Sequence, residues 1–214
     1  MKIVVYTAIT NGFDELKEQQ NTQGADFVAF LDFAPEQTIW QARKAHVGFS
    51  DPVRDAKIHK ILPQRYLPEY DYWLWMDGTL TLRVPAKELV EKYLGGADIA
   101  LFAHSCRRSV GEELAACIGY RKDDPQIMTR QVEGYQKEGF PDNLGLWECT
   151  MILRRNTKAV REFNKLWWEE IKKGSRRDQL SFPYVCWKTG IKINTIPGNV
   201  YNGGNDYFYY QGHN

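Results

Sequence analysis

The segment YDYWLWMDGTLTL, residues 70–82, joins a run of large apolar side chains to an abrupt polar turn. The apolar residues 72–76 predict a buried β-strand, which ends at Asp77, Gly78 and Thr79. An acidic residue at the carboxyl end of a buried strand is typical of a ligand site in an α/β sheet. The segment therefore predicts an interior strand that presents the Asp77 carboxylate to a ligand.

Two enzyme classes place an acidic turn after such a strand. In phosphatases of the haloacid-dehalogenase type, a nucleophilic aspartate stands two residues before the Asp-Gly-Thr, and Trp75 holds that position here. An indole ring cannot form an aspartyl phosphate, so the nucleophile of that class is missing. In the second class, the glycosyltransferases, an Asp-x-Asp-like turn holds a divalent metal against a sugar-nucleotide diphosphate.

Length and composition indicate one ordinary globular domain. The chain has 214 residues, of which 43% are hydrophobic and 26% charged, and we expect residues 1–214 to form a single domain. The formal net charge of +1 argues against a protein that coats nucleic acid or an anionic membrane. No apolar run approaches the length of a membrane span, so neither nucleic acid nor a membrane span is expected.

The N-terminus and the cysteines predict a cytoplasmic protein. Residues 1–9, MKIVVYTAI, resemble a strand and lack a signal-peptide cleavage pattern. Cys106, Cys117, Cys149 and Cys186 are far apart among apolar neighbours, which favours buried free thiols. Free thiols are typical of the reducing cytoplasm.

Apolar runs alternate with helical patterns along the chain. Strands are expected at residues 2–9, 26–32, 72–76, 98–104, 150–155 and 192–196. Helical patterns cover residues 84–94 and 156–174. The second begins with Asn156 as the expected N-cap and ends at Gly174, and one face carries Val160, Phe163, Trp167 and Ile171. The alternation predicts an α/β domain with a mainly parallel central sheet flanked by helices.

Three expected strands end in polar residues. Asp77 and His104 each follow an apolar run, and Tyr6 and Thr7 lie near the end of the first strand. Ligands in open α/β sheets bind beyond the carboxyl ends of the strands. We therefore expect these side chains at the rim of a pocket.

Basic residues precede the opening segment at nearly helical spacing. Arg54, Lys57 and Lys60 fall roughly on one face of an expected helix. A departing diphosphate is stabilised by positioned positive charge. A solvated basic face explains the same spacing.

The longer segment AKIHKILPQRYLPEYDYWLWMDGTLTL, residues 56–82, resembles glycogenin-like transferases of glycosyltransferase family 8. It resembles more closely a family of transferase-like proteins from bacteria and plants, long described as a domain of unknown function. Residues 4–16, 104–117 and 167–188 are also similar to blocks of that family, so the resemblance spans nearly the whole chain. It implies the GT-A fold and sugar transfer from a nucleotide-diphosphate donor, expected to be a UDP-sugar. The acceptor is an unknown glycan, lipid or protein.

The resemblance also implies roles for individual residues. It implies donor contacts from Tyr6, Thr7, Ala8, Arg54, Lys57, Asp77, Gly78, Thr79, His104 and Arg107, with residues 6–8 at the nucleoside. It implies a catalytic group of Asp178, Gln179 and Glu148 around the transferred sugar. Family 8 retains anomeric configuration, which favours retention here; Glu148 or Asp178 would be the carboxylate base of an inverting enzyme.

The implied metal is Mn²⁺ or Mg²⁺, held by Asp77 and His213. Thr79 replaces the second aspartate of Asp-x-Asp, and a hydroxyl is a poorer ligand for a hard cation. Lys57 and Arg54 are alternatives for part of the charge neutralisation. A terminal residue such as His213 is equally consistent with a solvent-exposed side chain.

Several site residues have plain structural explanations. Asp178 fits a helix N-cap, Glu148 simply begins a strand, and residues 104–113 fit a loop that enters a helix with acids in its first turn. The tail, residues 197–214, is either frayed or folded back over a site.

Two other functions compete with transfer. A non-catalytic sugar- or nucleotide-binding protein would explain Thr79. A nucleotidyltransferase would need a basic, Gly-rich loop after the first strand, but residues 7–16 contain one glycine and no basic residue.

Overall fold

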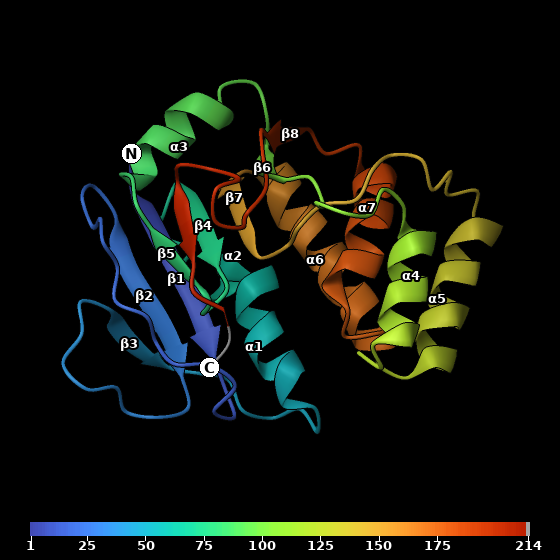
Figure 1. Cartoon of the computed structure of the whole chain (residues 1–214), viewed down its shortest axis with the longest axis horizontal. Coiled ribbons are helices and arrows are strands. Elements are labelled where there is room, and N and C mark those ends of the chain that lie inside the picture. The colour runs from blue at the N-terminus through green and yellow to red at the C-terminus, as the bar shows by residue number, and fades with distance from the viewer. Residues whose placement is uncertain (213–214) are drawn as a thin grey trace.

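The computed structural model describes residues 1–212, and within them a seven-stranded sheet forms the centre of the molecule (Figure 1). In spatial order the strands are β3 (Gln41–Lys44), β2 (Asp26–Leu31), β1 (Ile3–Ile9), β4 (Tyr72–Met76), β7 (Met151–Arg155), β6 (Ile99–Phe102) and β8 (Ile193–Ile196). All six strands expected from apolar runs are present. Strand β3 was not expected, because it is a short, largely exposed edge strand without an apolar run.

Strand β7 is reversed within an otherwise parallel sheet. It pairs antiparallel with β4 and β6, whereas the other pairs of this sheet are parallel. The start of β7 therefore lies at the edge where β4 and β6 end, and Asp77 N donates to Thr150 O at 2.8 Å. In the same way Glu148 N donates to Phe102 O at 2.9 Å. The mainly parallel sheet is confirmed, and its one reversal brings Glu148 to the ligand edge.

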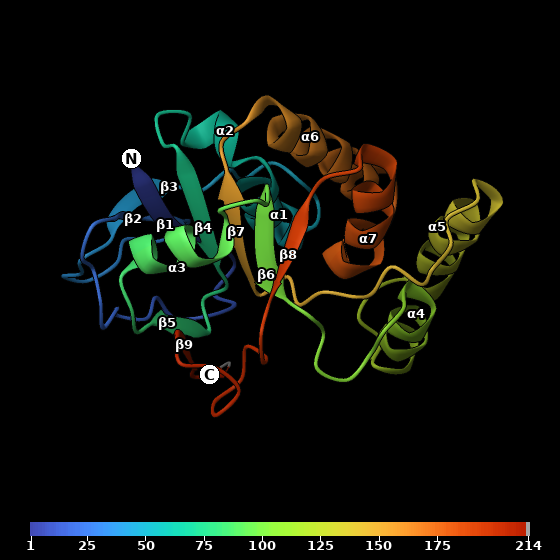
Figure 2. The ribbon, with the colours of Figure 1, turned by 90° about the horizontal axis from the view of Figure 1, so that it is seen from above.

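Helices cover both faces of the sheet. Helix α1 (Pro52–Ile61) packs on β1 and on α6 (Lys158–Lys173), which in turn packs on α7 (Asp178–Thr189); α2 (Pro63–Tyr66) follows α1 directly. Figure 2 shows α3 (Ala86–Tyr93) on the opposite side of the sheet from α6, next to the small antiparallel pair of β5 (Leu80–Leu82) and β9 (Phe208–Tyr210). Helices α4 (Val110–Gly119) and α5 (Pro125–Lys137) form an outlying hairpin beyond α7 (Figures 1 and 2).

The opening segment forms the interior strand that its apolar run predicts. In β4 the side chains of Trp73, Leu74, Trp75 and Met76 are all buried. Such burial on both faces is typical of a strand covered by helices on each side. Asp77 follows at the carboxyl end, and Leu80 N donates to Asp77 O at 3.1 Å to close the turn.

Helix α6 has the predicted apolar face, but its start is one residue later than expected. The four face residues are all fully buried. The N-cap is Thr157, whose side chain accepts from Val160 N at 3.2 Å. The prediction of Asn156 is wrong, because its amide instead donates to Tyr70 O at 2.7 Å and fixes the preceding loop.

The cysteines follow the prediction at three of four positions. Cys117, Cys149 and Cys186 are buried free thiols, but Cys106 is free and exposed. It lies in the loop after β6, and that loop is at the surface. Within residues 1–212, no helix is both long and apolar enough to cross a membrane.

Candidate active site

A cleft of about 770 Å³ opens at the edge of the sheet where β4 and β6 end and β7 begins. Helix α1, the start of α7 and the C-terminal tail complete its walls. The lining residues are Lys57, Lys60, Asp77, Thr79, His104, Ser105, Cys106, Arg107, Lys122, Glu148, Cys149, Thr150, Arg177, Asp178, Gln179, Asn199, Tyr201, Asn202 and Tyr210. The cleft thus occupies the position at which open α/β sheets bind ligands.

Two lysines and one aspartate form the charged centre of the cleft. Lys57 and Lys60 lie one turn apart on α1, and the Nζ atom of each is 2.8 Å from Asp178 Oδ2. Asp178 is the first residue of α7, and Arg177 occupies the N-cap position. The N-cap explanation of Asp178 is therefore wrong, because its carboxylate is directed at the lysines instead of the helix backbone.

The ion pairs determine the protonation of this centre. Burial opposes the charge of Asp178, but Lys57, Lys60 and Arg177 together hold the pKa of its carboxyl well below the usual range. Burial lowers the pKa of Lys57, and the nearby Asp178 carboxylate only partly compensates. For Lys60 burial is outweighed by Asp178 and Asp77, which raise its pKa. Two ammonium groups thus share one carboxylate oxygen, which suits an anionic ligand.

Asp77 connects the opening segment to this centre. Its Oδ1 atom accepts from Trp75 Nε1 at 2.7 Å and from Lys60 Nζ at 3.3 Å. A Cβ atom on Gly78 would lie 3.1 Å from Asp14 Cβ and 3.2 Å from Ile9 Cδ1. Glycine therefore lets the turn pack closely against the end of β1, while Asp77 stays at the cleft.

The described residues do not form a complete metal site. Among residues 1–212, no group of three or more His, Cys, Asp and Glu side chains is arranged to hold an ion. Asp77 offers a carboxylate with one oxygen already engaged, and Thr79 offers a hydroxyl at the cleft. His213, the other predicted ligand, lies outside the described residues. A hard divalent cation needs several oxygen ligands, which the Asp77 and Thr79 side chains alone do not supply.

His104 and Glu148 form a second buried polar group in the cleft. His104 Nδ1 accepts from the backbone N–H groups of Cys106 and Arg107, each at 3.1 Å, and its Nε2 lies 2.7 Å from Arg107 Nη2. His104 Nε2 lies 3.5 Å from Glu148 Oε1. That buried oxygen has no hydrogen-bond partner within the described part of the chain, and burial raises the pKa of Glu148. A hydroxyl group of a ligand in the cleft would satisfy this oxygen.

Arg107 and Gln179 also reach the cleft, as expected from the sequence. Arg107 Nε donates to the buried Glu113 at 2.6 Å, which fixes the guanidinium at the rim. Glu113 lies in the first turn of α4. The segment is therefore a loop that enters a helix, as expected, and it also places Arg107 at the cleft. Gln179 donates from Nε2 to Trp147 O at 3.4 Å and lies beside Asp178 at the start of α7.

Five predicted donor-binding residues do not line the cleft: Tyr6, Thr7, Ala8, Arg54 and Gly78. Tyr6 is fully buried, and its hydroxyl donates to Lys60 O at 2.9 Å. Arg54 does not line the cleft, and its guanidinium binds Asp51 and the carbonyls of Ile171 and Gly174 at the end of α6. Tyr6 and Arg54 thus hold α1, which forms one wall of the cleft, from behind.

The structure also brings to the cleft residues that were not assigned individual roles from the sequence, although Lys60 belonged to the basic spacing expected on this helix. Lys60 and Arg177 could have been predicted from the sequence. Each is close to a predicted site residue and shares its helix or helix start. Lys122 lies in the loop between α4 and α5, where no local pattern marks it.

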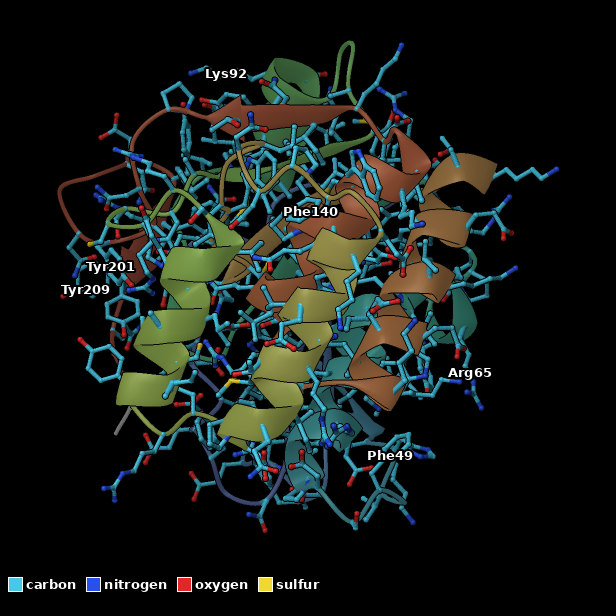
Figure 3. The ribbon with its side chains drawn as sticks, turned by 90° about the vertical axis from the view of Figure 1, so that its right-hand side faces the viewer. Phe49, Arg65, Lys92, Phe140, Tyr201 and Tyr209 are labelled. Carbon is cyan, nitrogen blue, oxygen red and sulfur yellow. The ribbon has the colours of Figure 1, made fainter. Side chains whose placement is uncertain are left out.

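The C-terminal tail folds back over the cleft, which decides between the two alternatives for it. Strand β9 pairs with β5, and Gln211 N donates to Thr79 O at 2.8 Å. Asn202 donates to Tyr210 O at 2.7 Å and closes the loop between them. Figure 3 shows Tyr201 and Tyr209 together at one edge of the molecule, and both side chains are partly exposed.

Residues 39–201, most of the chain, match the family described as TOD1/MUCI70, glycosyltransferase-like domain. The chain belongs to this family. It is 30% identical over 222 residues to "Probable hexosyltransferase MUCI70" of Arabidopsis thaliana, an alignment that covers 90% of this chain. It covers 38% of that relative, so the chain spans well under half of the relative's length.

Solved glycosyltransferases share the fold of this TOD1/MUCI70 domain. The bifunctional enzyme WbbM superposes with a TM-score of 0.53 at 12% identity, over 96% of this chain and 41% of that one. A glycosyltransferase involved in glycosylation of the major capsid of PBCV-1 superposes with a TM-score of 0.53 at 8% identity. That match covers 98% of this chain and 92% of the other. An active-site mutant of LgtC superposes with a TM-score of 0.50 at 12% identity, and the match covers 91% of this chain and 72% of the other. The expected GT-A fold is confirmed.

Proposed function

We propose that this domain transfers a hexose from a nucleoside-diphosphate donor, with UDP as the nucleotide, to an acceptor hydroxyl. The observation that carries the proposal is the pair of lysines on α1 that meets Asp178 in the cleft. Membership of a glycosyltransferase-like family and a relative named as a probable hexosyltransferase support a hexose. The resemblance to family 8 supports UDP.

Lys57 and Lys60 would bind the diphosphate of the donor. When the glycosidic bond breaks, negative charge develops on the diphosphate, and fixed ammonium groups stabilise it. Both side chains are largely buried, so water screens their charge poorly. Asp178 keeps the two like charges together before the donor arrives.

Gln179, Asp178 and Glu148 would surround the transferred sugar. The free Oε1 of Glu148 would accept from a sugar hydroxyl, and the Gln179 amide would add a neutral contact. Because the lysines hold the pKa of Asp178 low, its carboxylate is a weak base and a poor acceptor of the nucleophile's proton. Asp178 is thus unsuited to be the base of an inverting enzyme, and Glu148 is assigned here to a sugar hydroxyl. We therefore propose retention of anomeric configuration, as the resemblance to family 8 implies, with Asp178 in an electrostatic role.

A divalent ion would be bound together with the donor. Asp77 would be its ligand from the described residues, and His213 is the second proposed ligand. When bound, Mn²⁺ or Mg²⁺ would neutralise diphosphate charge beside that neutralised by the lysines. The incomplete donor set of the described residues leads us to expect weak metal binding in the absence of nucleotide.

Calorimetry with UDP, GDP and dTDP, each with and without Mn²⁺, tests the donor. We expect UDP to bind best and Mn²⁺ to strengthen it. Transfer from UDP-hexoses is then measured by the release of UDP, and the anomer of the product by NMR. Absence of binding for all three nucleotides would overturn the proposal, whereas binding without UDP release would identify a non-catalytic nucleotide-binding protein.

A further inference from the structure

A buried arginine stands behind the cleft, at the centre of the sheet. Arg154 on β7 is fully buried. Its guanidinium contacts the carbonyl oxygens of Lys60 and Ile61, the hydroxyl of Tyr6, and Asn164 Oδ1 at 2.8 Å. All these partners are neutral. A buried cation is normally paired with a carboxylate, so this arrangement calls for a specific role.

The guanidinium lies at the C-terminal end of α1. Helix α1 ends at Ile61, and the last carbonyls of a helix have no partner within the helix. Arg154 binds two of them, where a positive charge is also favoured by the helix dipole. The arginine therefore caps the helical turn that carries Lys60.

Tyr6 completes this cap from the neighbouring part of the sheet. Its hydroxyl accepts from Arg154 and donates to Lys60 O at 2.9 Å. Its ring packs edge-on against Trp75, whose indole in turn donates to Asp77. The same two aromatic residues thus support both Lys60 and Asp77 from behind the cleft.

We propose that Arg154 and Tyr6 are positioning residues, which cap α1 so that the Lys60 ammonium is held between Asp178 and Asp77 in readiness for a diphosphate. The inference rests on the proposed function for its ligand. Arg154 and Tyr6 themselves do not touch the ligand, since neither lines the cleft. Their effect on binding acts through the backbone of Lys60.

The first test removes one hydroxyl and keeps its ring. Tyr6→Phe retains the packing against Trp75 and removes the hydrogen bond to Lys60 O. We expect UDP affinity, measured by calorimetry, to fall about three- to tenfold. Arg154→Lys keeps the charge but loses the planar, forked guanidinium, and we expect it to lower UDP affinity about tenfold or more.

Tyr135→Phe is the matched control. Tyr135 is also buried, its hydroxyl donates to Glu170 Oε2 at 2.8 Å between α5 and α6, and neither residue lines the cleft. It should lower the urea midpoint of unfolding to a similar degree and leave UDP affinity unchanged. Equal affinities of Tyr6→Phe and Tyr135→Phe would overturn the positioning role.

A double-mutant cycle shows whether the effect acts through Lys60. In a Lys60→Met background, Tyr6→Phe should change UDP affinity by less than about twofold. An undiminished effect would assign Tyr6 some other route to the ligand and contradict the proposal.

A second cycle needs no nucleotide. Tyr6→Phe and Asp178→Asn should shift the urea midpoint non-additively, because both act on Lys60, whereas Tyr135→Phe and Asp178→Asn should add. If the unmodified protein binds no nucleoside diphosphate, the proposed function fails, and this cycle decides the positioning role: coupling supports it and additivity overturns it.

Discussion

Helices α1 and α6 pack against each other, yet they bury different kinds of residue. The buried side of α6 is built mainly from apolar residues such as Val160, Phe163 and Trp167. The buried residues of α1 include Asp55, His59 and Lys60. One helix thus contributes chiefly to the core, and the other uses buried positions to hold charges and loops.

Each buried polar residue of α1 has a defined partner. Asp55 Oδ1 accepts from Gly48 N at 3.0 Å and fixes the loop before the helix. His59 Nε2 accepts from His46 N at 2.8 Å, and burial lowers the pKa of His59 to about 3, so the ring stays neutral. Lys60 meets Asp178. The difference between the helices shows that burial can organise a site as well as a core, although His59 Nδ1 has no hydrogen-bond partner among the described residues.

The largest expected effect on stability belongs to α6. Phe163→Ala removes a fully buried ring and should cost about 3–5 kcal/mol in the free energy of unfolding, measured with urea. UDP affinity, measured where the variant is still folded, should be unchanged. A clear loss of UDP affinity would contradict the assignment of α6 to the core and of α1 to the site.

Asp178→Asn should lower both stability and turnover. The variant leaves Lys57 and Lys60 close together without their shared counter-ion, so that Lys60 has only Asp77, and breaking such a buried pair costs about 3–5 kcal/mol. The residue is thus more than a contact for sugar, and the melting temperature should fall together with the rate of UDP release.

The dependence of stability on pH in the acid range shows whether charge or packing causes the loss of stability in Asp178→Asn. The folded-state pKa of Asp178 lies below the ordinary value of 3.8, so its contribution is complete above pH 3.8 and is lost as the pH falls through the lower, folded-state value. The stability gap between wild type and Asp178→Asn should therefore narrow below pH 3.8. A gap that is independent of pH would mean that packing, and not charge, is responsible.

Lys57→Ala should affect binding more than folding. A lost charge-assisted contact should weaken UDP binding by about 1.5–3 kcal/mol, measured by calorimetry. Lys165→Ala is the control from α6, where the lysine is 61% exposed and pairs with Glu162. Equal UDP affinities of the two variants would remove Lys57 from the diphosphate site.

The smallest effect is expected at the start of α6. Thr157→Ala removes the N-cap and should cost about 1 kcal/mol in the free energy of unfolding, with no change in UDP affinity. Thr157→Ser keeps a capping hydroxyl and should restore most of the loss. If serine does not rescue, the threonine acts through its methyl group and not as a cap.

The sequence predicted much of the fold because the relevant signals are local. The apolar run before Asp77 predicted a buried strand, and the spacing from Val160 to Ile171 predicted a helix with one apolar face. The exact cap of α6 was missed, since Asn156 and Thr157 are both good N-caps and only the contact of Asn156 with Tyr70 separates them.

The site was predicted in part. Asp77, Lys57 and Asp178 do lie in one cleft. Tyr6 and Arg54 do not, because strand and helix patterns give no information on which buried neighbour a polar side chain meets. Tyr6 meets Lys60 O, and Arg54 meets the end of α6.

The sequence by itself determined the alternation of strands and helices, the family resemblance, and the acidic residue at the end of β4. These follow from hydrophobic periodicity and from residues that are close together along the chain. Only the tertiary structure decided that α1 and the start of α7 share one ion-paired centre, that reversed β7 brings Glu148 to it, and that the tail covers it. Such contacts join distant segments, and their partners depend on how whole elements pack.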